Sequence, residues 1–97
     1  MTDDEMLVLL RADLQRQGIT LPGETEFLTQ KLQAAKSRLE LQGIQPSEDY
    51  AWTELVVSTA AWMYRKRING EPEPRFLRDM RHDMLVSQKM RGGSDVT

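Results

Sequence analysis

The sequence predicts a single all-α domain, and three features support this prediction. Apolar residues recur at spacings of three and four along most of the 97-residue chain. Single glycines and prolines separate these periodic segments. No segment alternates apolar and polar residues as a half-buried strand does. We therefore expect a compact four-helix bundle-like domain over residues 1–91 and a flexible C-terminal tail over 92–97.

The first helix is expected over residues 3–17. Thr2 and Glu5 have the spacing of a capping box, in which each side chain accepts a hydrogen bond from the other residue's backbone N–H. Acidic residues in the first turn also favour the positive end of the helix dipole. The apolar stripe consists of Met6, Leu9, Leu10 and Leu14.

The second helix is expected over residues 24–42, after a turn at Pro22 and Gly23. Gly43 has the freedom to adopt the left-handed conformation that ends a helix, and Ile44 can fold back on the last turn. Pro46 then prevents the helix from continuing. The apolar stripe consists of Phe27, Leu28, Leu32, Ala35 and Leu39.

The third helix, expected over residues 48–69, is the longest apolar element. Ser47 and the acidic residues after it favour a helix start. The charge-free stretch over 55–64 is far shorter than the roughly 20 residues that cross a bilayer, so we expect it in a protein core. One face consists of Trp52, Leu55, Val56, Thr59, Ala60 and Met63. A helix this apolar must be surrounded by other elements.

The fourth helix is expected over residues 75–90. Asn69 and Gly70 provide the stop before it, and two prolines make the connector over 71–74 stiff and extended. The helix repeats its apolar residues at spacings of three and four, in Phe76, Leu77, Met80, Met84 and Leu85.

The composition excludes several classes of protein. The chain has no cysteine, so it can form neither disulfides nor a thiolate zinc site. Its N-terminus opens with acidic residues and lacks the pattern of a signal peptide, so we expect no export. Charge is nearly balanced, with 13 basic and 15 acidic residues, which is not typical of a nucleic-acid-binding protein. The first half of the chain is nevertheless acidic and the second half mildly basic.

No group of residues forms a recognisable catalytic, cofactor or metal site. His82 has Asp79 and Asp83 nearby in sequence, but one histidine with flanking carboxylates lacks the convergent ligands that metal sites use. The sequence contains neither a nucleophile-elbow motif nor a glycine-rich phosphate loop. We therefore expect no enzymatic activity, no metal and no cofactor.

Six cations fall close together in the sequence, at the end of the third helix and the start of the fourth. Single helix-end charges would account for some of them. A run interrupted by few acids would also suit an acidic partner surface or phosphates. The candidate assembly surface consists of Arg65, Lys66, Arg67, Arg75, Arg78 and Arg81.

The segment over 50–90 resembles the C-terminal half of a family of small helical head-tail connector proteins of tailed bacteriophages and prophages. The similarity lies in the order of its features: an apolar helix over 56–62, a basic helix end over 64–67, a connector with glycine and proline, a helix start over 74–77 and a closing segment over 85–90. The apolar stripe of the second helix falls where the family places its second-helix core.

The resemblance implies a structural adaptor of the virion, without an enzymatic step. Such proteins are made in the bacterial cytoplasm and assemble at the head-tail junction as a ring, commonly twelve-fold, beneath the portal once DNA is packaged. They bind the portal protein on one side and a stopper or tail-completion protein on the other. The six cations would then face an acidic neighbour or the DNA channel, and no contact with a membrane is expected.

The alternative is a small helical nucleic-acid-binding module, such as a packaging or regulatory factor. It would predict DNA binding that weakens with salt and depends on the six cations. The fourth helix follows a proline-rich connector rather than the tight bend of a helix-turn-helix, which favours the assembly role.

Overall fold

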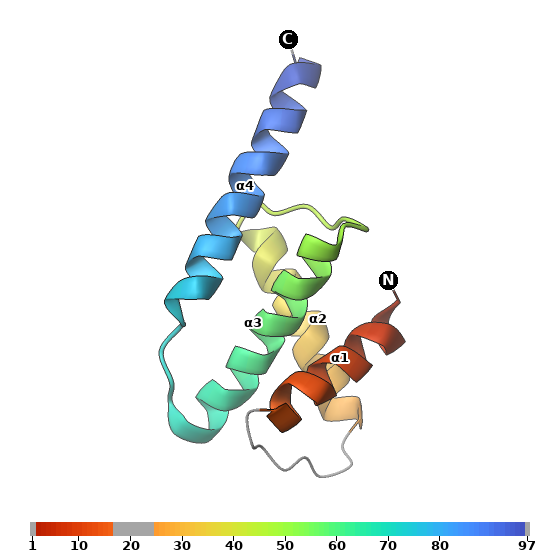
Figure 1. Ribbon diagram of the computed structural model, residues 1–97, viewed down its shortest axis with the longest axis vertical. Coiled ribbons are helices and arrows are strands. Elements are labelled where there is room, and N and C mark those ends of the chain that lie inside the picture. The colour runs from red at the N-terminus through yellow and green to blue at the C-terminus, as the bar shows by residue number, and fades with distance from the viewer. Residues whose placement is uncertain (1, 17–24, 97) are drawn as a thin grey trace.

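The structure is a computed structural model that describes residues 2–16 and 25–96, with the backbone alone for Thr25, Ile68 and residues 91–96. The described residues form four helices and no strand: α1 (Asp3–Arg16), α2 (Thr25–Leu41), α3 (Tyr50–Asn69) and α4 (Arg75–Val96) (Figure 1). The predicted all-α, four-helix bundle-like fold is confirmed. The turn predicted at Pro22 and Gly23 lies outside the described residues.

The third helix organises the molecule, as its apolar sequence predicted. α1, α2 and α4 all pack against α3, and α1 and α2 also pack against each other. α4 runs back along α3 in the opposite direction, and its C-terminal end projects past the rest of the molecule (Figure 1). The shape is consequently elongated, with extents of 50 × 27 × 20 Å.

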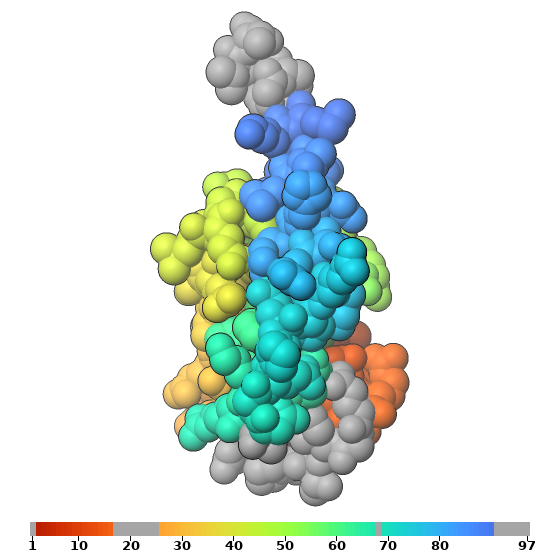
Figure 2. Space-filling model, turned by 90° about the vertical axis from the view of Figure 1, so that its left-hand side faces the viewer, coloured from red at the N-terminus to blue at the C-terminus, as the bar shows by residue number. Residues whose placement is uncertain are grey.

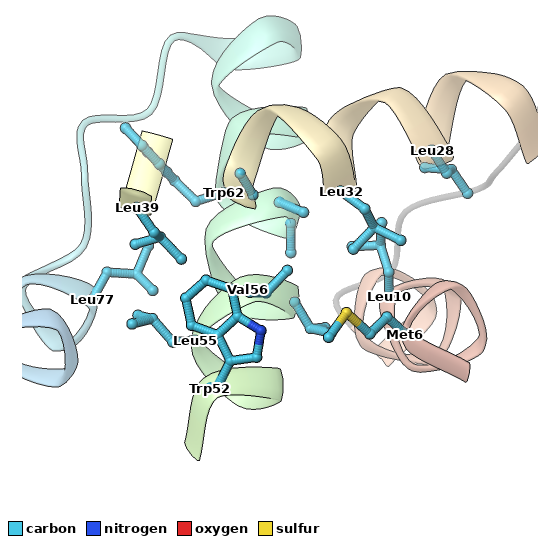
Figure 3. Close-up of a cluster of buried hydrophobic side chains, with 14 of the residues drawn as sticks. Met6, Leu10, Leu28, Leu32, Leu39, Trp52, Leu55, Val56, Trp62 and Leu77 are labelled. Carbon is cyan, nitrogen blue, oxygen red and sulfur yellow. The ribbon is translucent and has the colours of Figure 1, made fainter. Parts of the chain in front are cut away.

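The core is formed by the apolar stripes of the four helices. Figure 3 shows labelled side chains from all four helices converging around α3. Burial of one such leucine stabilises the fold by about 1.5–3 kcal/mol relative to leaving it exposed. Residues at most 3% exposed include Met6, Leu10, Leu14, Leu28, Leu32, Ala35, Leu39, Trp52, Leu55, Val56, Ala60, Trp62 and Leu77.

Two predicted helix ends are confirmed by their hydrogen bonds. The backbone N–H of Thr2 donates to Glu5 Oε1 at 3.1 Å, and the N–H of Glu5 donates to Thr2 Oγ1 at 3.2 Å, which is a capping box. At the end of α2, Gly43 has φ of 91° and its N–H donates to the oxygen of Glu40. The N–H of Ile44 donates to Leu39 at 3.0 Å, which completes a Schellman motif.

α3 begins at Tyr50, two residues after the predicted start at 48. The hydroxyl of Ser47 accepts a 2.9 Å hydrogen bond from the backbone N–H of Asp49, so it closes a local turn instead of capping a helix. Asp49 is the N-cap residue. The C-terminal end at Asn69 is as predicted, because Gly70 adopts φ of 70° and donates to the oxygen of Lys66.

α4 continues to Val96, although the sequence predicted an end at 90 and a flexible tail over 92–97. Gly92 and Gly93 therefore lie within the helix rather than ending it. A glycine inside a helix costs about 1 kcal/mol relative to alanine, but its N–H still bonds the carbonyl four residues earlier. No proline follows that would force a stop.

α4 is attached to the α2–α3 link by a reciprocal pair of hydrogen bonds. The backbone N–H of Gln45 donates to Gln88 Oε1 at 2.9 Å, and Gln88 Nε2 donates to the backbone oxygen of Gln45 at 2.8 Å. The apolar contact of α4 with the core is made mainly by Leu77 and Met84, which are buried. These contacts hold α4 alongside α3.

Candidate assembly surface

The six predicted cations come from the end of α3 and the first two turns of α4. Gly70 and the extended connector over 71–74 reverse the chain between the two helices. In Figure 1 the extended connector separates the last turn of α3 from the start of α4, which begins partway back along α3. In Figure 2 this side of the molecule faces the viewer, with the connecting region in teal in its lower part.

Two of the six cations are neutralised inside the molecule. Arg65 Nε donates to Glu71 Oε2 at 3.0 Å, and Arg81 Nη1 bonds Glu73 Oε1. The side chains of Arg65 and Arg81 are only 13% and 20% exposed. Glu73 also lies 3.9 Å from a guanidinium nitrogen of Arg38 in α2. The connector glutamates therefore bind helices instead of being solvated, and these two arginines position the connector.

Trp62 also holds the connector, through a hydrogen bond from its indole. It is 3% exposed, and its indole Nε1 donates to the backbone oxygen of Glu71 at 3.0 Å. The guanidinium carbon of Arg38 lies 5.1 Å from the centre of its ring, and Lys66 Nζ lies 5.2 Å from it. Trp62 is thus a core residue, and it also orients the cation of Lys66.

A second aromatic contact places Arg67. The rings of Phe27 and Tyr64 meet edge to face, with centroids 5.7 Å apart and an interplanar angle of 73°. The guanidinium carbon of Arg67 lies 4.7 Å from the centre of the Phe27 ring, and Lys31 Nζ lies 5.3 Å from it. Arg67 therefore packs on a ring of α2 while remaining exposed to solvent.

The remaining charges form what we call the basic corner: Lys66, Arg67, Arg75 and Arg78. All four side chains are exposed. Over residues 2–16 and 25–96, the ion pairs of the structure include none of these four cations. An exposed group of cations without counter-charges attracts acidic protein surfaces and phosphates. Of the six predicted residues, these four have the charge available for such a partner.

A groove that the sequence did not reveal lies between α1 and the first half of α3. Its volume is about 250 Å³, and its lining includes Leu9 and Val57 together with the carboxylates of Asp13 and Glu54. Tyr50 borders it and is 71% exposed. The groove is invisible in the sequence because its two walls belong to helices more than 30 residues apart.

The carboxylates at the start of α1 stabilise the helix and its packing. Asp3 accepts hydrogen bonds from Lys36 and, at 2.9 Å, from Gln33 Nε2, both in α2. The hydrogen bond from Lys36 lowers the pKa of Asp3 below its ordinary value. Hydrogen bonds from the backbone N–H and hydroxyl of Thr2 likewise lower the pKa of Glu5. The capping role of Glu5 is as predicted, whereas the contacts of Asp3 with α2 were not predicted from the sequence.

His82 is exposed on α4 and borders a shallow groove with Leu85 and Val86. In the part of the chain that the structure describes, no three histidine or carboxylate side chains gather closely enough to hold a metal ion. Nor does any helix there combine the length and the apolar character needed to cross a bilayer.

Comparisons of the chain with protein-family models, with curated proteins and with solved structures found no match.

Proposed function

We propose that this chain is a structural subunit of a phage head-tail junction, an adaptor that assembles as a ring beneath the portal. The observation that carries the proposal is the basic corner. Its four exposed cations come from the last turn of α3 and the first turn of α4, on the two sides of the connector, and each lacks a carboxylate partner among the described residues. Together with the order of features in 50–90, this surface suits a protein that works by binding other components.

The hairpin presents this surface with little freedom to move. Trp62 and Arg65 hold the connector through Glu71, and Arg81 holds it through Glu73. A surface that is already ordered loses less conformational entropy on binding. These partly buried pairs therefore favour tight assembly without contributing contacts of their own to the partner.

In the proposed role the subunit binds the portal protein on one side and a stopper or tail-completion protein on the other. Neighbouring subunits of the ring complete its contacts. The basic corner faces an acidic surface of a neighbour or the packaged DNA in the channel. The role requires no reaction step, cofactor or metal.

Electron microscopy of particles from a phage or induced prophage tests this role. Deletion of the reading frame is expected to give DNA-filled or leaking heads beside free tails. Complementation with the wild-type chain should restore tailed virions, and complementation with Arg75→Glu and Arg78→Glu combined should not. Normal tailed virions from the deletion strain would exclude the connector role.

The basic corner also suits phosphates, so nucleic-acid binding is the second candidate function. Duplex DNA titrated against the purified protein at two salt concentrations separates the two. For contacts to about three or four phosphates, a tenfold rise in salt would weaken DNA binding by roughly three orders of magnitude. Salt-dependent duplex binding that is lost in the Arg75→Glu, Arg78→Glu variant, together with normal virions from the deletion, would favour the nucleic-acid module.

A further inference from the structure

We infer that the groove between α1 and α3 is a receptor for an arginine or lysine side chain, and that a second copy of this chain supplies that side chain from its basic corner. The inference rests on the proposed function, because it names the surface that meets a neighbouring subunit. It adds a specific acceptor site, the groove bordered by Tyr50 and Glu54.

The groove has the chemistry of a site for a long cationic side chain. Leu9 and the buried Val57 provide apolar surface for the methylene groups of the stem. Tyr50 and Glu54 are four residues apart on α3, so they share one face of the helix. An exposed aromatic ring beside a carboxylate can bind a guanidinium through its face and its charge together.

Among the described residues that line the groove, two are carboxylates, Asp13 and Glu54, and one is a cation, Arg16. Asp13 already lies 3.9 Å from Arg16, whose side chain is 77% exposed. Glu54 is exposed and forms no ion pair with any residue that the structure describes. The negative charge of Glu54 can therefore pair with one further cation that enters the groove.

The groove and the basic corner lie on different parts of the molecule. Tyr50 and Glu54 belong to the first two turns of α3, whereas Lys66 and Arg67 belong to its last turn. One copy can therefore use both surfaces at once, each toward a different neighbour. An interface between two different surfaces of the same chain is heterologous and produces rings or filaments rather than closed dimers.

Sedimentation velocity of the purified chain tests the inference. Wild-type protein is expected to self-associate at low ionic strength, about 50 mM, and to dissociate at roughly 500 mM, where charges are strongly screened. Glu54→Arg should weaken association by about tenfold or more, because it places a like charge opposite the incoming cation. Glu40→Arg is the matched control: it makes the same change at an exposed position of α2 outside the groove and should leave association near the wild-type level.

A mixing experiment distinguishes a lost contact from a lost fold. Glu54→Arg alone and the combined Arg75→Glu, Arg78→Glu variant alone are each expected to remain monomeric. Mixed in equal amounts they should associate, because the reversed groove of one fits the reversed corner of the other. Circular dichroism should show that both variants keep the helical content of the wild type.

Three results would overturn the inference: wild-type protein that stays monomeric at low salt, equal effects of Glu54→Arg and Glu40→Arg, or failure of the mixed variants to associate. These results are separate from the particle experiment. If the deletion strain gives free tails and complementation with the Glu54→Arg chain restores a normal virion yield, the connector role is kept and the role of the groove is discarded. If association depends on the groove but the deletion strain gives normal virions, the role of the groove is kept and the connector role is discarded.

Discussion

The indole Nε1 of Trp62 donates a 3.0 Å hydrogen bond to the backbone oxygen of Glu71, across the reversal between α3 and α4. Trp62→Phe keeps most of the buried ring but removes this donor and leaves the carbonyl without its partner. We expect the free energy of unfolding to fall by about 1–3 kcal/mol more than the loss of ring size alone explains. Urea denaturation measures this difference.

Trp52→Phe is the control for that substitution. Trp52 is as buried as Trp62, at 3% exposed, and its substitution by phenylalanine removes the same atoms. The structure shows no hydrogen bond from the Trp52 indole among the described residues. Equal destabilisation by the two substitutions would mean that the bond to Glu71 contributes nothing to holding the connector.

Glu73 joins two arginines from different helices, Arg38 and Arg81. Glu73→Gln would leave both cations without a carboxylate in a site where Glu73 and Arg81 are only 18% and 20% exposed. We expect a loss of about 1–3 kcal/mol in the free energy of unfolding, less than for a fully buried pair because water still reaches these groups. Chemical denaturation should show it, and the effect should shrink at high salt.

Glu48→Gln makes the same chemical change at an exposed position before α3 and should alter stability by less than about 0.5 kcal/mol. If Glu73→Gln were no more destabilising than Glu48→Gln, the connector would not depend on these ion pairs.

The ion pair of Asp3 with Lys36 predicts a pH dependence of stability. Because Lys36 lowers the pKa of Asp3 in the folded chain, the unfolded chain binds this proton more tightly. The stabilisation is therefore complete above the ordinary value of 3.8 and is lost as the pH falls through the lower, folded value. Asp3→Asn should lower the melting temperature at pH 7, and the difference from wild type should shrink below about pH 4.

Asp4→Asn provides the comparison, since it removes a carboxylate from the same first turn of α1 without touching the bond to Lys36. A difference between wild type and Asp3→Asn that stays constant from pH 7 to strongly acidic pH would contradict the role of the ion pair.

Gly70 has φ of 70°, a conformation that residues with a Cβ adopt only under strain. Space is not the obstacle, because a Cβ at this position would meet no atom within 4 Å. Gly70→Ala should therefore cost about 1–2 kcal/mol from backbone strain alone. Gly70→Asn should cost less, because asparagine tolerates the left-handed region. Thermal unfolding of both variants checks this order, and equal costs would argue against a backbone cause.

The helices and their core faces could be predicted from short-range patterns. The capping box of Thr2 and Glu5 and the Schellman end at Gly43 involve residues at most five apart, so their geometry is already implied by residue order. The stripes of α2 and α3 follow the helical period, which fixes their buried faces whatever the angle between the helices. The predicted start of α3 was two residues early, because the hydroxyl of Ser47 makes a local hydrogen bond instead of capping the helix. The predicted end of α4 was also wrong, because two glycines did not suffice to stop the helix.

The candidate surfaces depended on contacts between helices. Six cations stood close together in the sequence, yet Arg65 and Arg81 are neutralised by Glu71 and Glu73, which reach them only because the connector folds back at Gly70. The groove is lined by Asp13 of α1 and Glu54 of α3, and no short-range pattern relates these residues. Residue order determined which segments are helical and which faces are apolar, since both depend on neighbours within one or two turns. The tertiary structure decided which charges are neutralised within the molecule and which remain exposed without an ion pair, because that depends on how the helices cross.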